Sequence, residues 1–75
     1  MNNNSINITK LFGERLRELR TDKGLSVKEL ADKLGFSDVA IVYWENNKRA
    51  ANAVAIYRIA QFFGVSSDYL LGLEN

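Results

Sequence analysis

The sequence predicts an all-α fold, in which five short helices form one compact domain without strands. Apolar residues recur at intervals of three and four, the spacing that places them on one face of a helix. Serine or asparagine precedes four of the expected helices, and glycine follows four of them, as is typical of helix caps. Residues 27–44 also carry the spacing of two helices joined by a tight turn.

Residues 1–8 are expected to form a flexible N-terminal tail, and residues 9–75 a single domain. Residues 2–7 are polar, low in complexity and uncharged. Such a segment buries too little apolar surface to offset the entropy lost on ordering. A chain of 75 residues is also too short to divide into two domains.

The first helix is expected over residues 9–23. Its apolar side consists of Leu11, Phe12, Leu16 and Leu19. Charged side chains occupy the opposite side, so the helix is amphipathic. Gly24 follows, at the place where a helix C-terminus favours a residue in the left-handed conformation.

The second helix is expected to begin with a capping box and to end near Leu34. The Ser26 side chain can cap the first turn, and Glu29 stands three residues later, where it can return a hydrogen bond to the cap. The apolar side of this helix consists of Leu30, Ala31 and Leu34.

Residues 27–44 indicate two helices packed across a tight turn. Ala31 has no side chain beyond Cβ, so a second helix can approach it closely. Gly35 can adopt the positive φ that the turn requires. Ile41 and Trp44 lie three residues apart, so they share one face of the next helix and anchor it. This is the helix-turn-helix pattern, one known use of which is to hold a helix against the DNA major groove.

The third helix is expected to begin after Ser37, its N-cap, and to end near Glu45. In the connection that follows, Asn47 is well suited to a left-handed conformation. Asn52 is the expected cap of a fourth helix that ends at Phe63 and Gly64.

The inward face of the fourth helix is expected to consist of Ile56, Ile59, Ala60 and Phe63. Ser66 caps a short last helix over Ser67–Leu71, which Gly72 stops.

Composition argues against an enzyme. The chain has no cysteine and no histidine, so thiolate metal sites and the commonest general base are absent. Carboxylates and lysines are not clustered as in a catalytic site, and neither a metal nor a cofactor is expected. No segment resembles a signal peptide or a membrane span, which makes a cytoplasmic protein the default expectation. Ten basic and nine acidic residues give a net charge of only +1.

Several stretches of the chain share the residue types and order of one known family. They are residues 13–20, 23–26, 29–35, 44–46, 48–49, 64–66 and 68–72. Over residues 12–72 the sequence therefore resembles the lambda-repressor-like (Cro/repressor, XRE) family of helix-turn-helix transcription regulators. The resemblance implies a five-helix DNA-binding domain, usually dimeric on a two-fold operator and often a repressor in bacteria or phage.

The resemblance also implies roles for individual residues. Family members pair an arginine of the first helix with the glutamate that ends the third, here Arg20 and Glu45; the alternative is two solvated charges that never meet. Such a pair fixes geometry more than it adds stability. The candidate contacts to the DNA backbone are Val27, Lys28, Ser37, Asn47, Lys48 and Arg49.

The third helix departs from the family pattern. With Ile41 and Trp44 inward, the side chains expected to face the bases are Asp38, Val39, Val42 and Tyr43. Many family members carry amide, hydroxyl or cationic side chains at these positions. Here the two valines could pack against thymine methyl groups.

A second interpretation of this face remains open, since an apolar stripe also marks protein interfaces. The expected function is sequence-specific DNA binding by a homodimer on an inverted-repeat operator, as a transcriptional regulator of the repressor kind. The alternative is an antitoxin-like adaptor that keeps the fold and binds a protein partner. A third possibility is that the stripe packs on the domain's own tail.

The C-terminal region is rich in apolar residues. Candidates for a dimer seam are Phe62, Tyr69, Leu71 and Leu73. Because isolated apolar residues are common on protein surfaces, an ordinary surface is the alternative.

Overall fold

The computed structural model describes residues 4–74, and all regular structure in that range is helical. The helices are α1 (Asn4–Asp22), α2 (Val27–Leu34), α3 (Asp38–Glu45), α4 (Ala53–Phe63) and α5 (Ser67–Leu71). The predicted all-α fold of five helices is confirmed for these residues. None of these helices combines the length and hydropathy that crossing a lipid bilayer would require.

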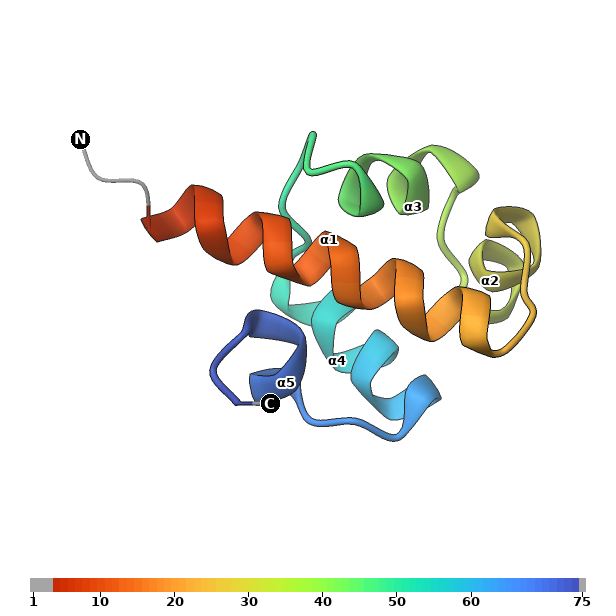
Figure 1. Cartoon of the computed structure of the whole chain (residues 1–75). Coiled ribbons are helices and arrows are strands. Elements are labelled where there is room, and N and C mark those ends of the chain that lie inside the picture. The colour runs from red at the N-terminus through yellow and green to blue at the C-terminus, as the bar shows by residue number, and fades with distance from the viewer. Residues whose placement is uncertain (1–3, 75) are drawn as a thin grey trace.

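Helix α1 organises the domain. It crosses the whole molecule in Figure 1, with α3 on one side and α5 on the other, and it packs against both. Helices α2 and α3 pack on each other as the two arms of the helix-turn-helix, while α4 contacts both α2 and α5. The outer side of α3 is therefore left uncovered by the other helices.

The core lies where all five helices meet. Its buried apolar side chains are Phe12, Leu16, Leu30, Ala31, Leu34, Ile41, Trp44, Ala55, Ile59, Ala60 and Leu70. The expected inward residues of α2 and the Ile41–Trp44 pair of α3 are thus confirmed. Leu11, Leu19, Ile56 and Phe63 are only partly buried, since so small a domain cannot fully cover every amphipathic face.

The predicted caps are also confirmed. The Ser26 hydroxyl accepts from the Glu29 backbone N–H at 3.0 Å, and the Glu29 carboxylate accepts from the Ser26 backbone N–H at 2.8 Å. The hydrogen bond from the Ser26 backbone N–H stabilises the charged carboxylate and is the main cause of the lowered pKa of Glu29. Ser37, Asn52 and Ser66 cap α3, α4 and α5.

The start of the first helix was predicted wrongly. We expected it at Thr9, but α1 begins at Asn4, so residues 4–8 of the predicted tail are helical. Once a helix is nucleated, each further residue adds a backbone hydrogen bond, so a polar sequence can extend a helix whose later turns pack in the core. Residues 1–3 of the predicted tail lie outside the described residues.

Gly13 allows α1 and α3 to touch backbone to backbone, a contact that the sequence analysis missed. A Cβ atom at this position would lie 2.5 Å from the Trp44 carbonyl oxygen and 2.9 Å from that of Glu45. It would also lie 2.7 Å from Oδ1 of Asn47. Only glycine therefore permits α1 to lie this close to the C-terminal end of α3.

Gly13→Ala is expected to destabilise the domain by about 1–3 kcal/mol, the usual cost of overpacking. Without the crowding, this replacement in a helix would stabilise by about 0.5–1 kcal/mol. Urea unfolding followed by circular dichroism measures the difference. Glu18→Ala, on the exposed side of α1, is the control and should change stability little. A Gly13→Ala variant more stable than the natural protein would show that α1 and the end of α3 leave room for a Cβ atom at this position.

Candidate nucleic-acid interface

The outer face of α3 consists of the four side chains predicted to point outward. Val39 is 56% exposed, Val42 40% and Tyr43 39%, and Asp38 is exposed at the first turn. The opposite face of α3 is sealed in the core, where Ile41 and Trp44 lie. No described segment of the chain packs over the outer face, so the third possibility, self-coverage by the domain, finds no support within residues 4–74.

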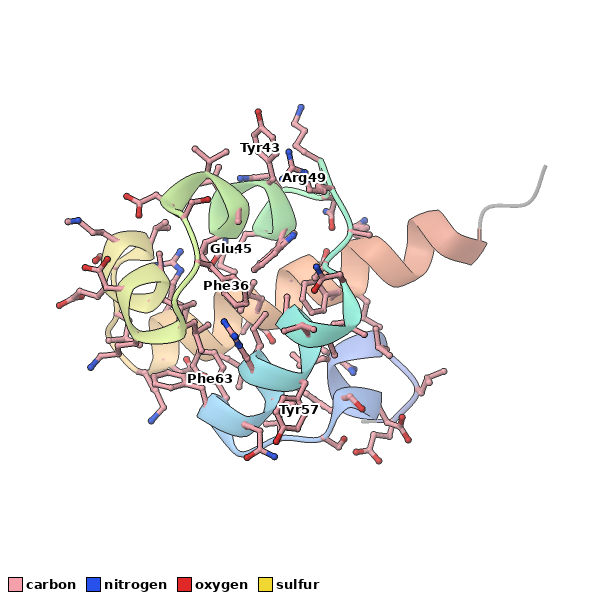
Figure 2. All side chains as sticks on the ribbon, turned by 180° about the vertical axis from the view of Figure 1, so that it is seen from behind. Phe36, Tyr43, Glu45, Arg49, Tyr57 and Phe63 are labelled. Carbon is pink, nitrogen blue, oxygen red and sulfur yellow. The ribbon has the colours of Figure 1, made fainter. Side chains whose placement is uncertain are left out.

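The loop after α3 folds back beside its last turn. Asn47 has a φ of 62°, the left-handed conformation predicted for it, and the Lys48 backbone N–H donates to the Tyr43 carbonyl at 2.8 Å. The Arg49 guanidinium lies 5.0 Å from the centre of the Tyr43 ring, and Figure 2 shows the two side chains together at the outer edge of the molecule. The candidate base-facing and backbone-binding residues therefore adjoin.

Glu45 fixes the orientation of α3 from the inside. The side chain is almost completely buried, and Arg20 of α1 binds it through both carboxylate oxygens, at 2.6 and 2.9 Å. Arg20 also donates to the Leu25 carbonyl at 2.8 Å. The hydrogen bond to Glu45 is the main cause of the raised pKa of Arg20. The predicted pair is therefore formed, and it joins α1, α3 and the α1–α2 connection.

Arg17 adds a second cation to this pair, which sequence reasoning missed. Its Nε lies 3.4 Å from Glu45 Oε1, and its Nη2 donates to Asn46 Oδ1 at 3.1 Å. The Arg17 side chain remains 53% exposed, so water screens much of its interaction. Its place one helical turn before Arg20 is the sequence signal that could have identified it.

The turn between α2 and α3 is held by aromatic contacts. Phe36 lies edge-on to Trp44 with ring centres 5.1 Å apart. From α4, Arg58 covers the Phe36 ring at 5.4 Å and donates to the Leu34 carbonyl at 3.4 Å. Helix α4 thus stabilises the turn that sets the angle of α3, another role that the sequence analysis did not assign.

The remaining candidates for backbone contact differ in availability. The Val27 side chain is partly buried against the core, which leaves chiefly its main chain accessible. Lys28 lies 3.8 Å from Asp32 in an exposed pair. The Ser37 hydroxyl accepts from the Ala40 backbone N–H at 3.1 Å and so already serves as a cap. Lys48 and Arg49 are the exposed cations beside the outer face of α3.

Two of the dimer candidates have partners within the domain. Phe62 packs edge-on against Phe63 with ring centres 4.9 Å apart and contacts the core. Tyr69 is half-buried beneath the guanidinium of Arg15, 4.2 Å from its ring centre. Both aromatic rings therefore contribute to the fold of this single chain.

One of the other two candidates lines a groove formed by α4, α5 and the residues between them. Leu71 lines it, and Leu73 is 69% exposed. Val54 and Tyr57, which sequence reasoning passed over, are 57% and 64% exposed on α4. Figure 2 shows Tyr57 on the side of the molecule opposite Tyr43. The groove is lined by Ala53, Ile56, Tyr57, Ala60, Gln61, Val65, Ser66, Ser67 and Leu71.

Comparison with known families and sequences identifies relatives of this chain. A family described as a helix-turn-helix domain matches residues 13–75. The HTH-type transcriptional activator BcrR of Enterococcus faecalis is 41% identical over 64 residues, covering 85% of this chain and 31% of the relative. The prophage-derived HTH-type regulator YonR of Bacillus subtilis is 36% identical over 61 residues, 81% of this chain and 56% of the relative.

Repressor protein C2 of Salmonella phage P22 is 33% identical over 63 residues, 84% of this chain and 29% of the relative. The chain therefore spans from about a third to just over half of these relatives. Among solved structures, the restriction-modification controller protein C.AhdI of Aeromonas hydrophila superposes with a TM-score of 0.75 at 35% identity. The match covers 83% of this chain and 94% of that one.

Arg20→Leu is expected to lower the free energy of unfolding by about 3 kcal/mol, because it leaves the buried Glu45 carboxylate without its main partner. Arg17→Ala removes the exposed cation from the same carboxylate and should cost less than about 1 kcal/mol. Urea unfolding of both variants measures these values. Equal costs would mean that burial does not decide the strength of the two interactions.

Proposed function

Because this chain belongs to the lambda-repressor-like (Cro/repressor, XRE) family of DNA-binding helix-turn-helix transcription regulators, we propose that it represses transcription by binding an inverted-repeat operator as a homodimer. Members of this family regulate transcription and are not enzymes. The observation that carries the proposal is the position of α3, which is anchored on one face and uncovered on the other. The bound protein would repress transcription by occluding the operator. We expect it to act in the cytoplasm.

The outer face of α3 would enter the major groove. Asp38, Val39, Val42 and Tyr43 then face base edges, where sequence is read. The Tyr43 hydroxyl can donate to a base or a phosphate, and the Asp38 carboxylate can accept from the amino group of cytosine. Near phosphates the charge of Asp38 is unfavourable, so this residue would restrict binding more than strengthen it.

The contacts to the DNA backbone would come from residues around that face. Lys48 and Arg49 supply charge at one end of α3, and Lys28 supplies it from α2. Ser37 and Asn47, with the main chain at Val27, would add uncharged contacts to phosphate oxygens. Such contacts set the position of the protein on the duplex without reading its sequence. A net charge of +1 suffices if the cations gather on this side.

The homodimer would form through α4 and α5. Val54, Tyr57 and Leu73 are among the most exposed apolar side chains of the domain, and Leu71 lines the groove beside them. Burying these side chains against a second copy would remove apolar surface from water. Phe62 and Tyr69, as partly buried residues, would contribute through their remaining exposed edges. A seam on this side leaves α3 uncovered in both copies.

A second candidate function is that of an adaptor that binds a protein through α3. The exposed stripe of Val39, Val42 and Tyr43 favours it, because contiguous apolar side chains mark interfaces. The two functions differ in what they require of Lys48 and Arg49, since only DNA binding needs cations at the end of the stripe.

Selection from a random duplex library at moderate salt tests the proposal. We expect enrichment of an inverted repeat whose half-sites lie about 34 Å apart, one duplex turn. Sedimentation of the protein with the enriched duplex should give two protein chains per duplex. Absence of enrichment, even at low salt, would contradict DNA binding. An enriched single half-site bound by one chain would contradict the homodimer alone.

Replacing Lys48 and Arg49 together by alanine should weaken binding to every duplex. The slope of log K against log salt should become shallower by about 0.9 for each phosphate that the variant no longer neutralises. Fluorescence anisotropy at several salt concentrations measures both effects. Lys10→Ala is the control for the loss of one cation, because Lys10 is exposed on α1 and outside the proposed interface and dimer seam. A slope unchanged by the double substitution would remove these residues from the interface.

A further inference from the structure

We propose that α3 recognises thymine by packing Val39 and Val42 against its 5-methyl group in the major groove. This inference rests on the proposed DNA binding. It specifies which base the outer face of α3 recognises. Its central claim is that specificity at the contacted base pairs depends on methyl groups more than on hydrogen bonds.

The two valines form the middle of the exposed face. They lie three residues apart, so their side chains neighbour each other on one side of α3. They are 56% and 40% exposed, and every branch of each side chain is apolar. In the major groove, the thymine methyl is the one apolar group that a base edge presents.

The outward residues of α3 lack the side chains that normally read guanine and adenine, and Asp38 alone among them matches a cytosine amino group. Guanine is normally read by a cation and adenine by an amide, each through two hydrogen bonds. Asp38 can only accept when ionised, and Tyr43 offers a single hydroxyl.

The amide of Asn46, the C-cap of α3, already has partners within the domain. Its Nδ2 donates to the Val42 carbonyl at 2.8 Å, and its Oδ1 accepts from Arg17 at 3.1 Å. Because both ends of this amide are held by partners within the domain, turning Asn46 to read an adenine would break these hydrogen bonds. The valines therefore remain as the principal means of discrimination.

The charges around the valines favour a duplex over an apolar protein groove. Lys48 and Arg49 border the stripe, and among residues 4–74 neither lies within 4.0 Å of a carboxylate. Arg49 is also held against the ring of Tyr43. An apolar strip with two cations at its C-terminal end matches a groove floor lined by methyl groups and flanked by phosphates, and the Asp38 carboxylate at the start of α3 opposes this match.

Uracil separates recognition of the methyl group from recognition by hydrogen bonds. Replacing thymine by uracil removes the methyl group and leaves all hydrogen-bonding groups in place. Replacing cytosine by 5-methylcytosine places a methyl at the same ring position of a G·C pair. The two substitutions thus change the apolar contact without changing the protein.

The experiment uses the duplex enriched by selection, with each thymine replaced singly by uracil. At the base pairs contacted by α3 we expect affinity to fall about fourfold per methyl, the factor that corresponds to ~0.8 kcal/mol. If such a pair is changed to G·C, methylating that cytosine should recover part of the loss. Thymines outside the contacted pairs serve as internal controls.

Protein variants identify the side chains responsible. Val39→Ala and Val42→Ala should bind more weakly to the thymine duplex and respond less to uracil. Both should remain folded, since alanine favours a helix more than valine. Thr21→Ala is the control: it shortens a branched, exposed side chain on α1, outside the proposed base-facing surface and dimer seam, and should keep the full response to uracil.

The outcomes distinguish this inference from the proposed function. Tight duplex binding that tolerates uracil everywhere would overturn methyl recognition and leave DNA binding intact. A uracil response that persists undiminished in both valine variants would also overturn it. Failure to bind any duplex, with or without capture of a protein partner, would overturn DNA binding itself and this inference with it.

Discussion

The buried carboxylate of Glu45 is the point on which the arrangement of α1 and α3 depends. It ends α3 and accepts two hydrogen bonds from Arg20, which also binds the main chain before α2. Gly13 brings the α1 backbone against the same end of α3. The Arg20–Glu45 hydrogen bonds and this close approach together fix how the two helices cross. Such a pair contributes geometry more than stability, because desolvation offsets much of the attraction. That geometry decides which side of α3 faces outward.

Much of the fold was predictable because its signals are local. Caps such as Ser26 and Asn52, and the left-handed Asn47, depend only on residues a few positions away, and all occupy their predicted conformations. The start of α1 was not predictable in this way. Whether polar residues before Thr9 continue a helix depends on turns that are fixed by packing elsewhere. The role of Gly13 requires knowing which helix crosses α1.

The candidate site was predictable to the same degree. Helical periodicity alone places Val39, Val42 and Tyr43 opposite the buried anchor, and their exposure agrees. The contact between Tyr43 and Arg49 was missed, because it depends on how the loop folds back. The exposed Val54 and Tyr57 were missed because helical periodicity identifies the buried face of α4. It does not indicate which apolar residues on the other face form a surface patch. What these side chains bind is a separate matter from where they point.

The one-sided attachment of α3 has a consequence for how such a domain can change over time. Asp38, Val39 and Val42 take no part in the core, and the grip on the helix comes from its other face and its last residue. Substitutions at these three positions would alter the surface offered to a ligand at little cost to folding. A few substitutions in α3 can therefore change what the domain binds while the fold is kept. Proteins with closely similar folds need not bind the same DNA sequence.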